Sequence, residues 1–322
     1  MIEYNIIILT FVLSFLFDIT FGELPFRIHP VVITGSLIEF FKKHLIGFKN
    51  KLSGLCVVVG VCSVSCVILY ILYLTSYVSM ILYLIVFILV LSSTFSFKML
   101  LKTAGDVKSA LDSDIEEARS LVSYLVSRDT DELSEAFIVS AAVESLSENI
   151  TDSYIAPVFY YFVFAALFCV FDKGLFYILL VPVFYRIFNT LDAMLGYETD
   201  ELIDIGYVPA KIDDVLNYIP ARISGVFIVI SSYILRYNGR NAFRIMMRDA
   251  RNCPSPNSGY TMATTAGALD IQLVKKDTYV LGDDTREITA DDISKAVRLS
   301  AMTIILFTVC IIALFILFFR LI

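Results

Sequence analysis

The sequence has little of several residue types on which common functional sites depend. It contains only two histidines, His29 and His44, and they lie too far apart to indicate a cluster of metal ligands. Five of its six cysteines lie within apolar stretches, where cysteine behaves as a small hydrophobic residue, and Cys253 stands alone in a polar segment. The sequence therefore predicts neither a disulfide framework nor a zinc site.

Basic residues never form a domain of their own. The formal net charge is −7, and the lysines and arginines lie beside apolar runs, which argues against nucleic acid as a partner. The pattern GxxxxGK[ST] is also absent from the sequence. Any nucleotide site must therefore differ from a P-loop.

Apolar residues, in contrast, are abundant. They make up 58% of the chain, and the mean hydropathy of +0.78 exceeds what a soluble domain of this length would carry. The composition predicts an all-α, polytopic integral membrane helical bundle with cytoplasmic amphipathic helices and loops, forming one domain over residues 1–322 of a multi-pass cell-membrane protein. The N-terminal run lacks a basic leading region and a small-residue cleavage site, so we expect a retained anchor rather than a signal peptide.

Six further apolar runs follow the N-terminal one. They cover residues 54–74, 78–97, 155–170, 175–185, 219–235 and 299–322. The first two and the last approach the roughly 20 residues that a spanning helix requires. The others are short enough to form a hairpin, a re-entrant piece or buried helices.

Lysines predict the orientation of the chain in the membrane. They flank the runs 54–74 and 78–97 on their outer sides, at Lys42, Lys43, Lys49, Lys51, Lys98 and Lys102. Both flanks should therefore be cytoplasmic, together with three polar regions at about 98–154, 186–218 and 236–298. A crossing by the run 219–235 would put one of the last two regions outside, so we expect that run to be non-spanning or interfacial.

The first polar region is predicted to be helical. Apolar residues recur at helical spacing over 107–125 opposite an acidic face, which predicts one amphipathic helix. Asp129 with Glu132 is expected to cap a second helix that ends near Pro157.

This second helix carries acidic residues close to the membrane. Glu144 and Glu148 are a like-charged pair four residues apart, and Asp152 follows after four more. Such pairs are destabilising on a helix, and each anion near a helix C-terminus costs roughly 0.3–1 kcal/mol. A bound cation would offset that cost. The alternative is a solvated acidic face, because most charge runs are of that kind.

A second cluster of oxygen donors favours the cation. Asn189 and Asp192 lie one helical turn apart after an apolar run, and Asp213, Asp214 and Asn217 precede the next run. Carboxylate and amide oxygens suit Mg²⁺, which usually keeps several waters and binds through one or two carboxylates plus substrate phosphates. The two clusters therefore predict a magnesium site.

Arginines form the third polar cluster. Four of them repeat every four residues, at Arg236, Arg240, Arg244 and Arg248. On a helix they would make one cationic stripe. Arg236 and Arg240 are expected to contact anionic lipid headgroups. Arg248 and Arg251 are predicted to bind a ligand phosphate, because they lead into a rigid Pro-Ser-Pro-Asn turn that ends at Asn257.

Short motifs follow one another along nearly the whole chain. They are His29-Pro30-Val31-Val32, Arg128-Asp129-Thr130, Ala142-Val143-Glu144-Ser145 through Glu148-Asn149 to Asp152 and Ala156-Pro157, Asn189-Thr190-Leu191-Asp192 with Gly196-Tyr197, Asp213-Asp214 with Pro220-Ala221-Arg222, and Arg248-Asp249-Ala250 to Pro254-Ser255-Pro256-Asn257-Ser258-Gly259. In this order and spacing the motifs resemble the adenosylcobinamide-phosphate synthase (CobD/CbiB) family of cobalamin biosynthesis. One departure is Cys253, because the family usually has a histidine before Pro-Ser-Pro.

The resemblance implies a membrane enzyme that joins a corrinoid, adenosylcobyric acid, to an aminoalcohol phosphate, (R)-1-amino-2-propanol O-phosphate. It implies Mg²⁺ as cofactor and ATP as co-substrate, with the carboxylate activated as an acyl phosphate, so the site must neutralise phosphates and position the amine. The predicted metal ligands are Glu144, Glu148, Asp152 and Asp192. The predicted phosphate ligands are Arg128, Arg248 and Arg251, and the residues expected to orient substrate amides or phosphate are Asn149, Asn189 and Asn257.

Two other functions remain open at the level of sequence. A membrane prenyl-type transferase also uses Asn and Asp clusters with Mg²⁺, on an isoprenoid diphosphate. A transporter or sensor would place its polar groups at mid-bilayer inside the spans, whereas the polar clusters of this chain lie at the ends of apolar runs.

Overall fold

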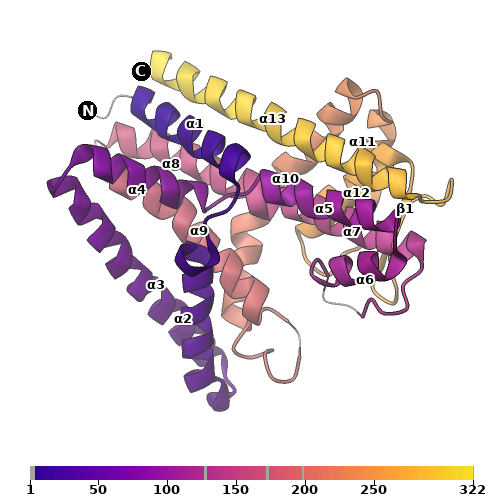
Figure 1. Ribbon diagram of the computed structural model, residues 1–322, viewed down its shortest axis with the longest axis horizontal. Helices are drawn as coiled ribbons and strands as arrows, with labels where there is room; N and C mark the ends of the chain where they lie inside the picture. Colours follow the sequence, from indigo (N-terminus) through magenta and orange to yellow (C-terminus); the bar gives the residue numbers. More distant parts are fainter. Residues whose placement is uncertain (1–3, 127–128, 172–173, 198, 322) are drawn as a thin grey trace. The chain divides into compact units, whose positions relative to one another are not determined.

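The computed structural model describes residues 4–126, 129–171, 174–197 and 199–321. Figure 1 shows that these segments are almost entirely helical, which confirms the predicted all-α class. The sequence does not predict one small element. It is an antiparallel hairpin of β1, Gln272–Lys275, and β2, Tyr279–Gly282.

Six helical segments in the described part of the chain are long and apolar enough to cross a membrane. They are α1 (Tyr4–Phe21), α3 (Lys51–Leu74, continued by a short turn to Tyr77), the consecutive α7 (Glu135–Ile150) and α8 (Ala156–Val170), α9 (Leu175–Leu195), α10 (Tyr207–Ile234) and α13 (Ala290–Leu321). At a rise of about 1.5 Å per residue, even the shortest of them approaches the roughly 30 Å of a bilayer core. These lengths agree with the predicted multi-pass membrane protein.

Shorter helices complete the fold. They are α2 (Pro30–Leu45), α4 (Met80–Ser92), α5 (Lys98–Leu111), α6 (Ile115–Ser123), α11 (Gly239–Asp249) and α12 (Ser258–Leu269), with single 3-10 turns at Phe26–Ile28, Ile46–Phe48 and Thr75–Tyr77.

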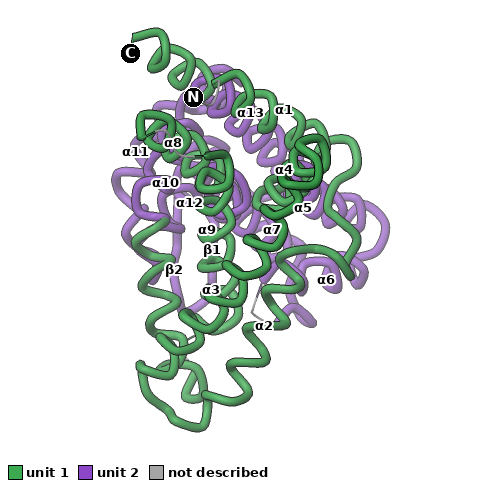
Figure 2. Tube along the Cα trace, turned by 90° about the vertical axis from the view of Figure 1, so that its left-hand side faces the viewer, with its two compact units in different colours: residues 1–96, 156–216, 311–322 green, residues 97–155, 217–310 purple. Residues whose placement is uncertain are grey.

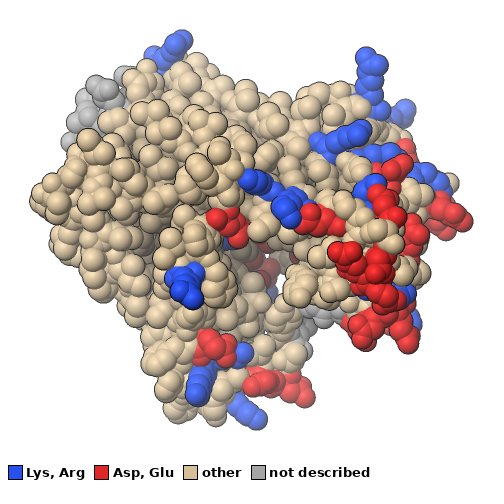
Figure 3. Space-filling model, in the orientation of Figure 1, with Lys and Arg blue, Asp and Glu red and all other residues tan. Residues whose placement is uncertain are grey.

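The chain forms two compact units, each made of segments that are far apart in sequence (Figure 2). Unit 1 comprises Met1–Ser96, Ala156–Leu216 and Ile311–Ile322, and unit 2 comprises Phe97–Ile155 and Asn217–Cys310. Charged side chains gather over the elements of unit 2 in Figure 3, whereas the face of unit 1 seen there is mainly uncharged. An uncharged helical surface is what contact with lipid requires, because ionisable groups are costly in hydrocarbon.

In unit 1, α2, α3 and α9 pack around a shared apolar core. Ile38 of α2, Val57 of α3 and Leu191 of α9 are fully buried there. Gly54 allows the chain before α10 to approach α3 closely, because a Cβ at this position would lie 2.2 Å from the carbonyl oxygen of Ile205. This packing holds the C-terminal half of α9, which carries the predicted polar residues of this unit.

In unit 2, α12 packs closely against α11 through glycines. A Cβ on Gly259 would lie 2.2 Å from the carbonyl oxygen of Ala250, and one on Gly267 would lie 2.7 Å from that of Asn241. β1 packs against α7, and β2 packs against α11 and α12. The hairpin therefore contacts both α7, which carries the acidic residues, and α11, which carries the arginines.

The prediction of a span-length helix over 78–97 is wrong. α4 covers only Met80–Ser92, 13 residues, or about 20 Å at ~1.5 Å per residue. The side-chain hydroxyls of Ser92, Ser93 and Thr94 each donate to a carbonyl three residues earlier, at 2.7–2.9 Å. Such local bonds compete with the helix and end it early.

The predicted amphipathic helix over 107–125 is two helices instead of one. α5 ends at Leu111, and α6 begins at Ile115 after Asp114, whose carboxylate accepts from the backbone N–H of Glu116 at 2.9 Å. Aspartate at an N-cap favours a new helix start over helix continuation. Val107, Ala118 and Val122 of the predicted apolar face are buried, whereas Ile115, the first residue of α6, is 38% exposed.

The predicted boundaries of the acidic helix are also wrong. α7 begins at Glu135 with Ser134 at the N-cap position, and the carboxylate of Asp129 accepts from the N–H of Asp131 at 3.0 Å instead of capping α7. The helical backbone does not end near Pro157 but passes through a π-helical turn, Thr151–Ile155, into α8. Because proline cannot donate to the preceding turn, a wider turn before it accommodates the missing bond.

The run 219–235 belongs to a longer helix. α10 has 28 residues, which is long enough to cross a membrane, and the non-spanning or interfacial role of the run stays a prediction. Pro220 lies inside it and cannot donate to the carbonyl of Leu216. The hydroxyl of Tyr160 donates to that carbonyl at 2.7 Å.

Candidate functional site

Glu144 is the most buried of the predicted acidic site residues. Its side chain is 4% exposed, and each carboxylate oxygen accepts a hydrogen bond from a hydroxyl. Ser140 donates to Oε1 at 2.6 Å, and Tyr279 of β2 donates to Oε2 at 2.8 Å. Ser140 in turn accepts from the backbone N–H of Val274 in β1 at 3.0 Å. Both strands of the hairpin therefore fix the orientation of this carboxylate, as burial of a charge requires.

The remaining acids of the stripe are more accessible than Glu144. Glu148, one turn after Glu144, is exposed, and Asp152 is partly buried in the π-helical turn. π-helical turns inside α-helices frequently occur at functional sites. Asn149 donates from Nδ2 to the carbonyl of Ser145 at 2.9 Å, within its own helix.

Cys253 and Tyr279 lie in the electrostatic field of these two glutamates. Burial raises the pKa of the Cys253 thiol to about 12, and the charges of Glu148 and Glu144 add to this effect. Burial also raises the pKa of the Tyr279 phenol, followed by the charge of Glu144 and the hydrogen bond to it. Both groups are therefore protonated near neutral pH. A protonated thiol cannot act as the general base that a histidine at position 253 could provide.

Asn257 is held by an arginine that the sequence reasoning did not single out. Arg222 of α10 donates from Nη1 to Oδ1 of Asn257 at 2.8 Å and from Nη2 to the carbonyl of Pro256 at 3.2 Å. Its guanidinium lies 3.6 Å from the ring centroid of Tyr218 and 4.2 Å from that of Tyr260. Arg222 is a single arginine within the apolar run 219–235, and its tertiary contacts show that it holds the turn in place.

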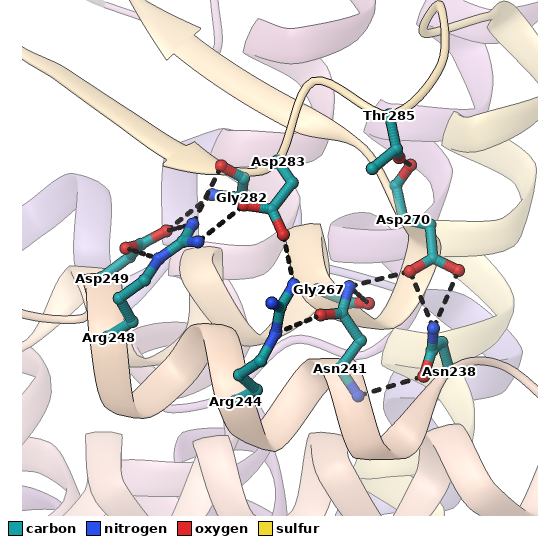
Figure 4. Close-up of polar contacts among 10 residues, drawn as sticks. All are labelled: Asn238, Asn241, Arg244, Arg248, Asp249, Gly267, Asp270, Gly282, Asp283 and Thr285. Atoms are coloured by element: carbon teal, nitrogen blue, oxygen red, sulfur yellow. Dashed lines mark hydrogen bonds and ion pairs between the residues drawn. The ribbon is translucent and has the colours of Figure 1, made fainter.

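Arg248 is held by carboxylates of the protein itself (Figure 4). Nε and Nη2 donate to the two oxygens of Asp249 at 2.6 and 2.7 Å, and Nη1 donates to Asp283 at 2.6 Å. Asp249 also accepts from the N–H of Gly282 at 2.9 Å. Arg244 pairs with the other oxygen of Asp283. The hydrogen bonds to Asp249 and Asp283 raise the pKa of the Arg248 guanidinium, so the group is permanently charged.

The predicted arginine stripe is therefore divided. Arg236 lies outside α11, with a left-handed φ of 59°, so the stripe begins at Arg240. Arg244 and Arg248 join α11 to β2, whereas Arg251 is exposed just beyond the helix end. Phosphate binding by Arg248 and Arg251 stays a prediction, and of the two Arg251 is the accessible one. Arg128 lies outside the described residues.

The predicted residues of unit 1 form a separate polar set. Arg186 of α9 donates from Nη1 to Oδ1 of Asn189 at 3.2 Å, and Nδ2 of Asn189 lies 3.5 Å from Oδ1 of Asp213 in α10. Asp192 lies one turn after Asn189, and a Cβ on Gly196 would meet its carboxylate at 2.0 Å. The sequence reasoning did not assign Arg186, although a single cation inside an apolar helix is the pattern that marks a functional residue in a membrane.

His29 belongs to the same unit and lies at the start of α2. Its Nδ1 accepts from the backbone N–H of Val31 at 3.2 Å. Burial lowers the pKa of the imidazole and the positive charge of Arg186 lowers it too, while Glu23 acts in the opposite direction. The neutral ring therefore caps α2, which is a structural role that the sequence did not reveal.

The metal site remains a prediction. Among the described residues, no group of three or more His, Cys, Asp or Glu side chains is arranged to hold a metal ion. Glu144, Glu148 and Asp152 lie in unit 2, and Asp192 lies in unit 1. Carboxylate oxygens are nonetheless the donors that Mg²⁺ prefers, and it binds through as few as one or two of them when phosphates supply the rest. The donor chemistry of Glu148 and Asp152 fits such a site.

Comparison with known proteins identifies the relatives of this chain. The family model described as "CobD/Cbib protein" matches residues 11–300. The chain belongs to the CobD/Cbib family. It is 42% identical over 308 residues to the "Probable cobalamin biosynthesis protein CobD" of Methanothermobacter thermautotrophicus, with 96% of each chain covered. It is 36% identical to the "Cobalamin biosynthesis protein CobD" of Dehalococcoides mccartyi, with 89% of this chain and 91% of that one covered.

A further relative is the "Probable cobalamin biosynthesis protein CobD" of Methanothrix thermoacetophila, 35% identical over 305 residues with 92% of both chains covered. No solved structure is significantly similar to the chain. The match to the CobD/Cbib family spans the acidic stripe, the α9 polar set and the Pro-Ser-Pro-Asn turn, since all lie within residues 11–300.

Proposed function

We propose that this protein acts in cobalamin biosynthesis as an adenosylcobinamide-phosphate synthase. It would join adenosylcobyric acid to (R)-1-amino-2-propanol O-phosphate in an ATP-dependent reaction that forms an amide bond. The observation that carries the proposal is the family match over residues 11–300. In addition, relatives that are named for cobalamin biosynthesis match this chain over about nine-tenths or more of their length. Acids, amides and arginines positioned in both units are consistent with this chemistry.

The reaction requires activation, because a carboxylate does not condense with an amine in water unaided. Transfer of the terminal phosphate of ATP to the corrinoid carboxylate forms an acyl phosphate and releases ADP. Attack of the amine nitrogen then forms the C–N bond, releases phosphate and requires loss of one proton from nitrogen. The protein must hold the anionic phosphates and place the amine against the activated carbon.

Unit 2 supplies the acidic part of this proposal. Glu148 and Asp152 are accessible carboxylates that would hold Mg²⁺ together with phosphate oxygens, and Mg²⁺ would neutralise phosphate charge when bound. Glu144 is held in one orientation by Ser140 and Tyr279. We assign it to the same site as a metal ligand or as the group that receives the amine proton.

Phosphate and amide recognition falls to the remaining residues. Arg251 is exposed and offers a planar fork for phosphate, next to the turn that Arg222 holds through Asn257. Arg248 could reach a phosphate only by leaving Asp249 and Asp283, so we assign it to holding α11 against β2. Asn189, oriented by Arg186, is suited to a substrate amide or phosphate.

The decisive experiment is turnover by the purified full-length chain in lipid nanodiscs. The protein is incubated with adenosylcobyric acid, ATP, Mg²⁺ and each of several aminoalcohol phosphates, and products are identified by mass spectrometry. The proposal expects the corrinoid amide together with ADP, and neither without ATP. Turnover of an isoprenoid diphosphate in place of the corrinoid would establish the prenyl-transferase alternative. Corrinoid binding without ATP consumption would favour a transporter or sensor.

A further inference from the structure

One face of α11 is exposed and amphipathic. Phe243 and Met247 are 53% and 68% exposed and lie one turn apart, with exposed Arg240 one turn before them. The opposite face, including Ala242 and Ile245, is fully buried. We call Arg240, Phe243 and Met247 the outer face of α11.

Positive charge flanks this outer face at both ends. Arg236 precedes it and Arg251 follows it, and both are exposed. Neither they nor Arg240 form an ion pair with any residue that the structure describes, whereas Arg244 and Arg248 turn away toward Asp283 (Figure 4). Three exposed arginines that form no ion pair with a described residue therefore flank the exposed apolar pair.

The outer face begins directly after a membrane-length helix. α10 ends at Ile234, where the N–H of Tyr237 donates to the carbonyl of Ser232 at 2.8 Å and Arg236 adopts the left-handed conformation. These are the features of a Schellman motif, which ends a helix and redirects the chain sharply. Tyr233 and Ile234 on the last turn of α10 are 59% and 50% exposed. An exposed apolar surface thus continues from α10 into α11.

We propose that α11 is an interfacial helix that binds the anionic lipid surface of the bilayer through its outer face. Phe243 and Met247 enter the boundary between headgroups and acyl chains, and Arg236 and Arg240 contact lipid phosphates. This pattern of large apolar side chains with flanking arginines is typical of helices that lie in the plane of a membrane surface. The binding does not depend on which reaction the protein catalyses, but it places α12 and the Pro-Ser-Pro-Asn turn at the membrane surface.

The absence of tryptophan from the chain allows a direct test. A Phe243→Trp variant carries a single tryptophan, whose fluorescence is measured in nanodiscs of phosphatidylcholine and phosphatidylglycerol in equal parts. The phosphatidylglycerol is brominated either near the glycerol end or near the methyl end of its acyl chains. The proposal expects about twofold or greater quenching by the former and less by the latter, because an interfacial side chain lies only about 5–10 Å below the headgroups.

Two single-tryptophan variants calibrate the depth. Tyr124→Trp lies at the C-cap of α6, where Tyr124 is 83% exposed, and should not be quenched by either lipid. Val309→Trp lies in the apolar part of α13, where Val309 is 60% exposed, and should be quenched by the methyl-end bromines. If the Phe243→Trp variant behaves like Tyr124→Trp, α11 lies in water and the proposal is wrong. If it behaves like Val309→Trp, the helix is not interfacial and the proposal is equally wrong.

The charge requirement is tested by brominating only one of the two lipid classes. Phe243→Trp should be quenched more by brominated phosphatidylglycerol than by brominated phosphatidylcholine. Adding Arg240→Gln should reduce this preference by up to about fivefold, the equivalent of ~1 kcal/mol for one arginine near an anionic surface. Equal quenching by both lipid classes, before and after Arg240→Gln, would show that anionic headgroups are not the partner. If adding inorganic phosphate abolishes the stronger quenching by brominated phosphatidylglycerol, the arginines bind a soluble phosphate ligand instead. That result would overturn the proposal.

Discussion

The hydroxyl of Tyr279 donates a hydrogen bond of 2.8 Å to Oε2 of Glu144, across a separation of 135 residues in sequence. With Ser140 on the other oxygen, it leaves the buried carboxylate no freedom to rotate. The hairpin that carries Tyr279 is also held by Arg244 and Arg248 through Asp283. α7 and α11 of unit 2 thus both contact one short β-hairpin.

The variant Tyr279→Phe should therefore distinguish the role of Tyr279 in orienting Glu144 for the reaction from its role in stability. Loss of the hydroxyl removes a hydrogen bond to a buried carboxylate, which should lower the free energy of unfolding by about 1–3 kcal/mol. If Glu144 acts in the reaction, kcat should also fall by about tenfold and the pH profile of kcat should shift, while KM changes little. Tyr124→Phe, on an 83% exposed tyrosine, is the control and should change neither quantity. An unshifted pH profile would reduce Tyr279 to a structural role.

Glu148→Gln should abolish turnover while the protein remains folded and inserted. The side chain is exposed, so the change removes a charge without leaving a cavity. We expect kcat to fall by more than about 100-fold, or ~2.7 kcal/mol, with partial recovery at high Mg²⁺ if the residue is a ligand. Glu135→Gln, an exposed acid in the first turn of the same helix, serves as the matched control. Equal activity of the two variants would place Glu148 on a merely solvated acidic face.

Arg251→Lys should lower kcat/KM by at least about tenfold, or ~1.4 kcal/mol, because lysine keeps the charge but loses the planar fork that grips phosphate. Arg248→Lys should instead act on stability, since it breaks the paired hydrogen bonds to Asp249. Arg240→Lys should be tolerated in both assays, because a lipid headgroup requires only the charge. Thermal unfolding and steady-state kinetics on the three variants distinguish these roles. Identical behaviour of all three would remove Arg251 from the phosphate site.

The stability of the protein should decrease as the pH falls through the titration range of His29. Burial lowers its pKa in the folded state, so the unfolded chain binds the proton more tightly, with a pKa of about 6.5. The contribution of neutral His29 to the free energy of unfolding is therefore fully present above about pH 6.5. It is lost as the pH falls through the lower pKa of the folded state. His29→Asn keeps a side-chain acceptor for the Val31 N–H but does not titrate. Thermal unfolding between about pH 8 and pH 5 should show a smaller slope in this variant, and an unchanged slope would assign the effect to other groups.

The two polar regions that carry the acidic clusters should face the cytoplasm. Ser113→Cys and Thr199→Cys, both at exposed positions, should react with an impermeant thiol reagent only from the cytoplasmic side of sealed vesicles. Val78→Cys, in the turn after α3 where Val78 is 80% exposed, should react only from the opposite side. Labelling of positions 113 and 199 from opposite sides would contradict the predicted orientation.

Much of the fold can be predicted from the sequence, because the length of apolar runs and helical periodicity are local properties of the sequence. Apolar runs of membrane length predicted α3 and α13, and helical periodicity predicted the burial of Val107 in α5 and of Ala118 and Val122 in α6. The errors arose where polar side chains compete with the backbone over a few residues. Ser92–Thr94 shortens α4, Asp114 separates α5 from α6, and the π-helical turn before Pro157 continues a helix that was expected to end.

The sequence by itself determined that this protein is helical, membrane-embedded and a member of the CobD/Cbib family, because composition, run length and motif order need no knowledge of distant contacts. Only the tertiary structure decided what each polar side chain does. Arg248 pairs with Asp283 35 residues away, and Arg222 holds Asn257 at a distance of 35 residues. Such bonds depend on how helices pack, and packing is decided by close contacts such as those at Gly259 and Gly267, which no spacing pattern in one chain reveals. The physical reason is that a carboxylate or guanidinium is neutralised by whichever partner the fold brings within hydrogen-bonding distance, independent of its place in the sequence.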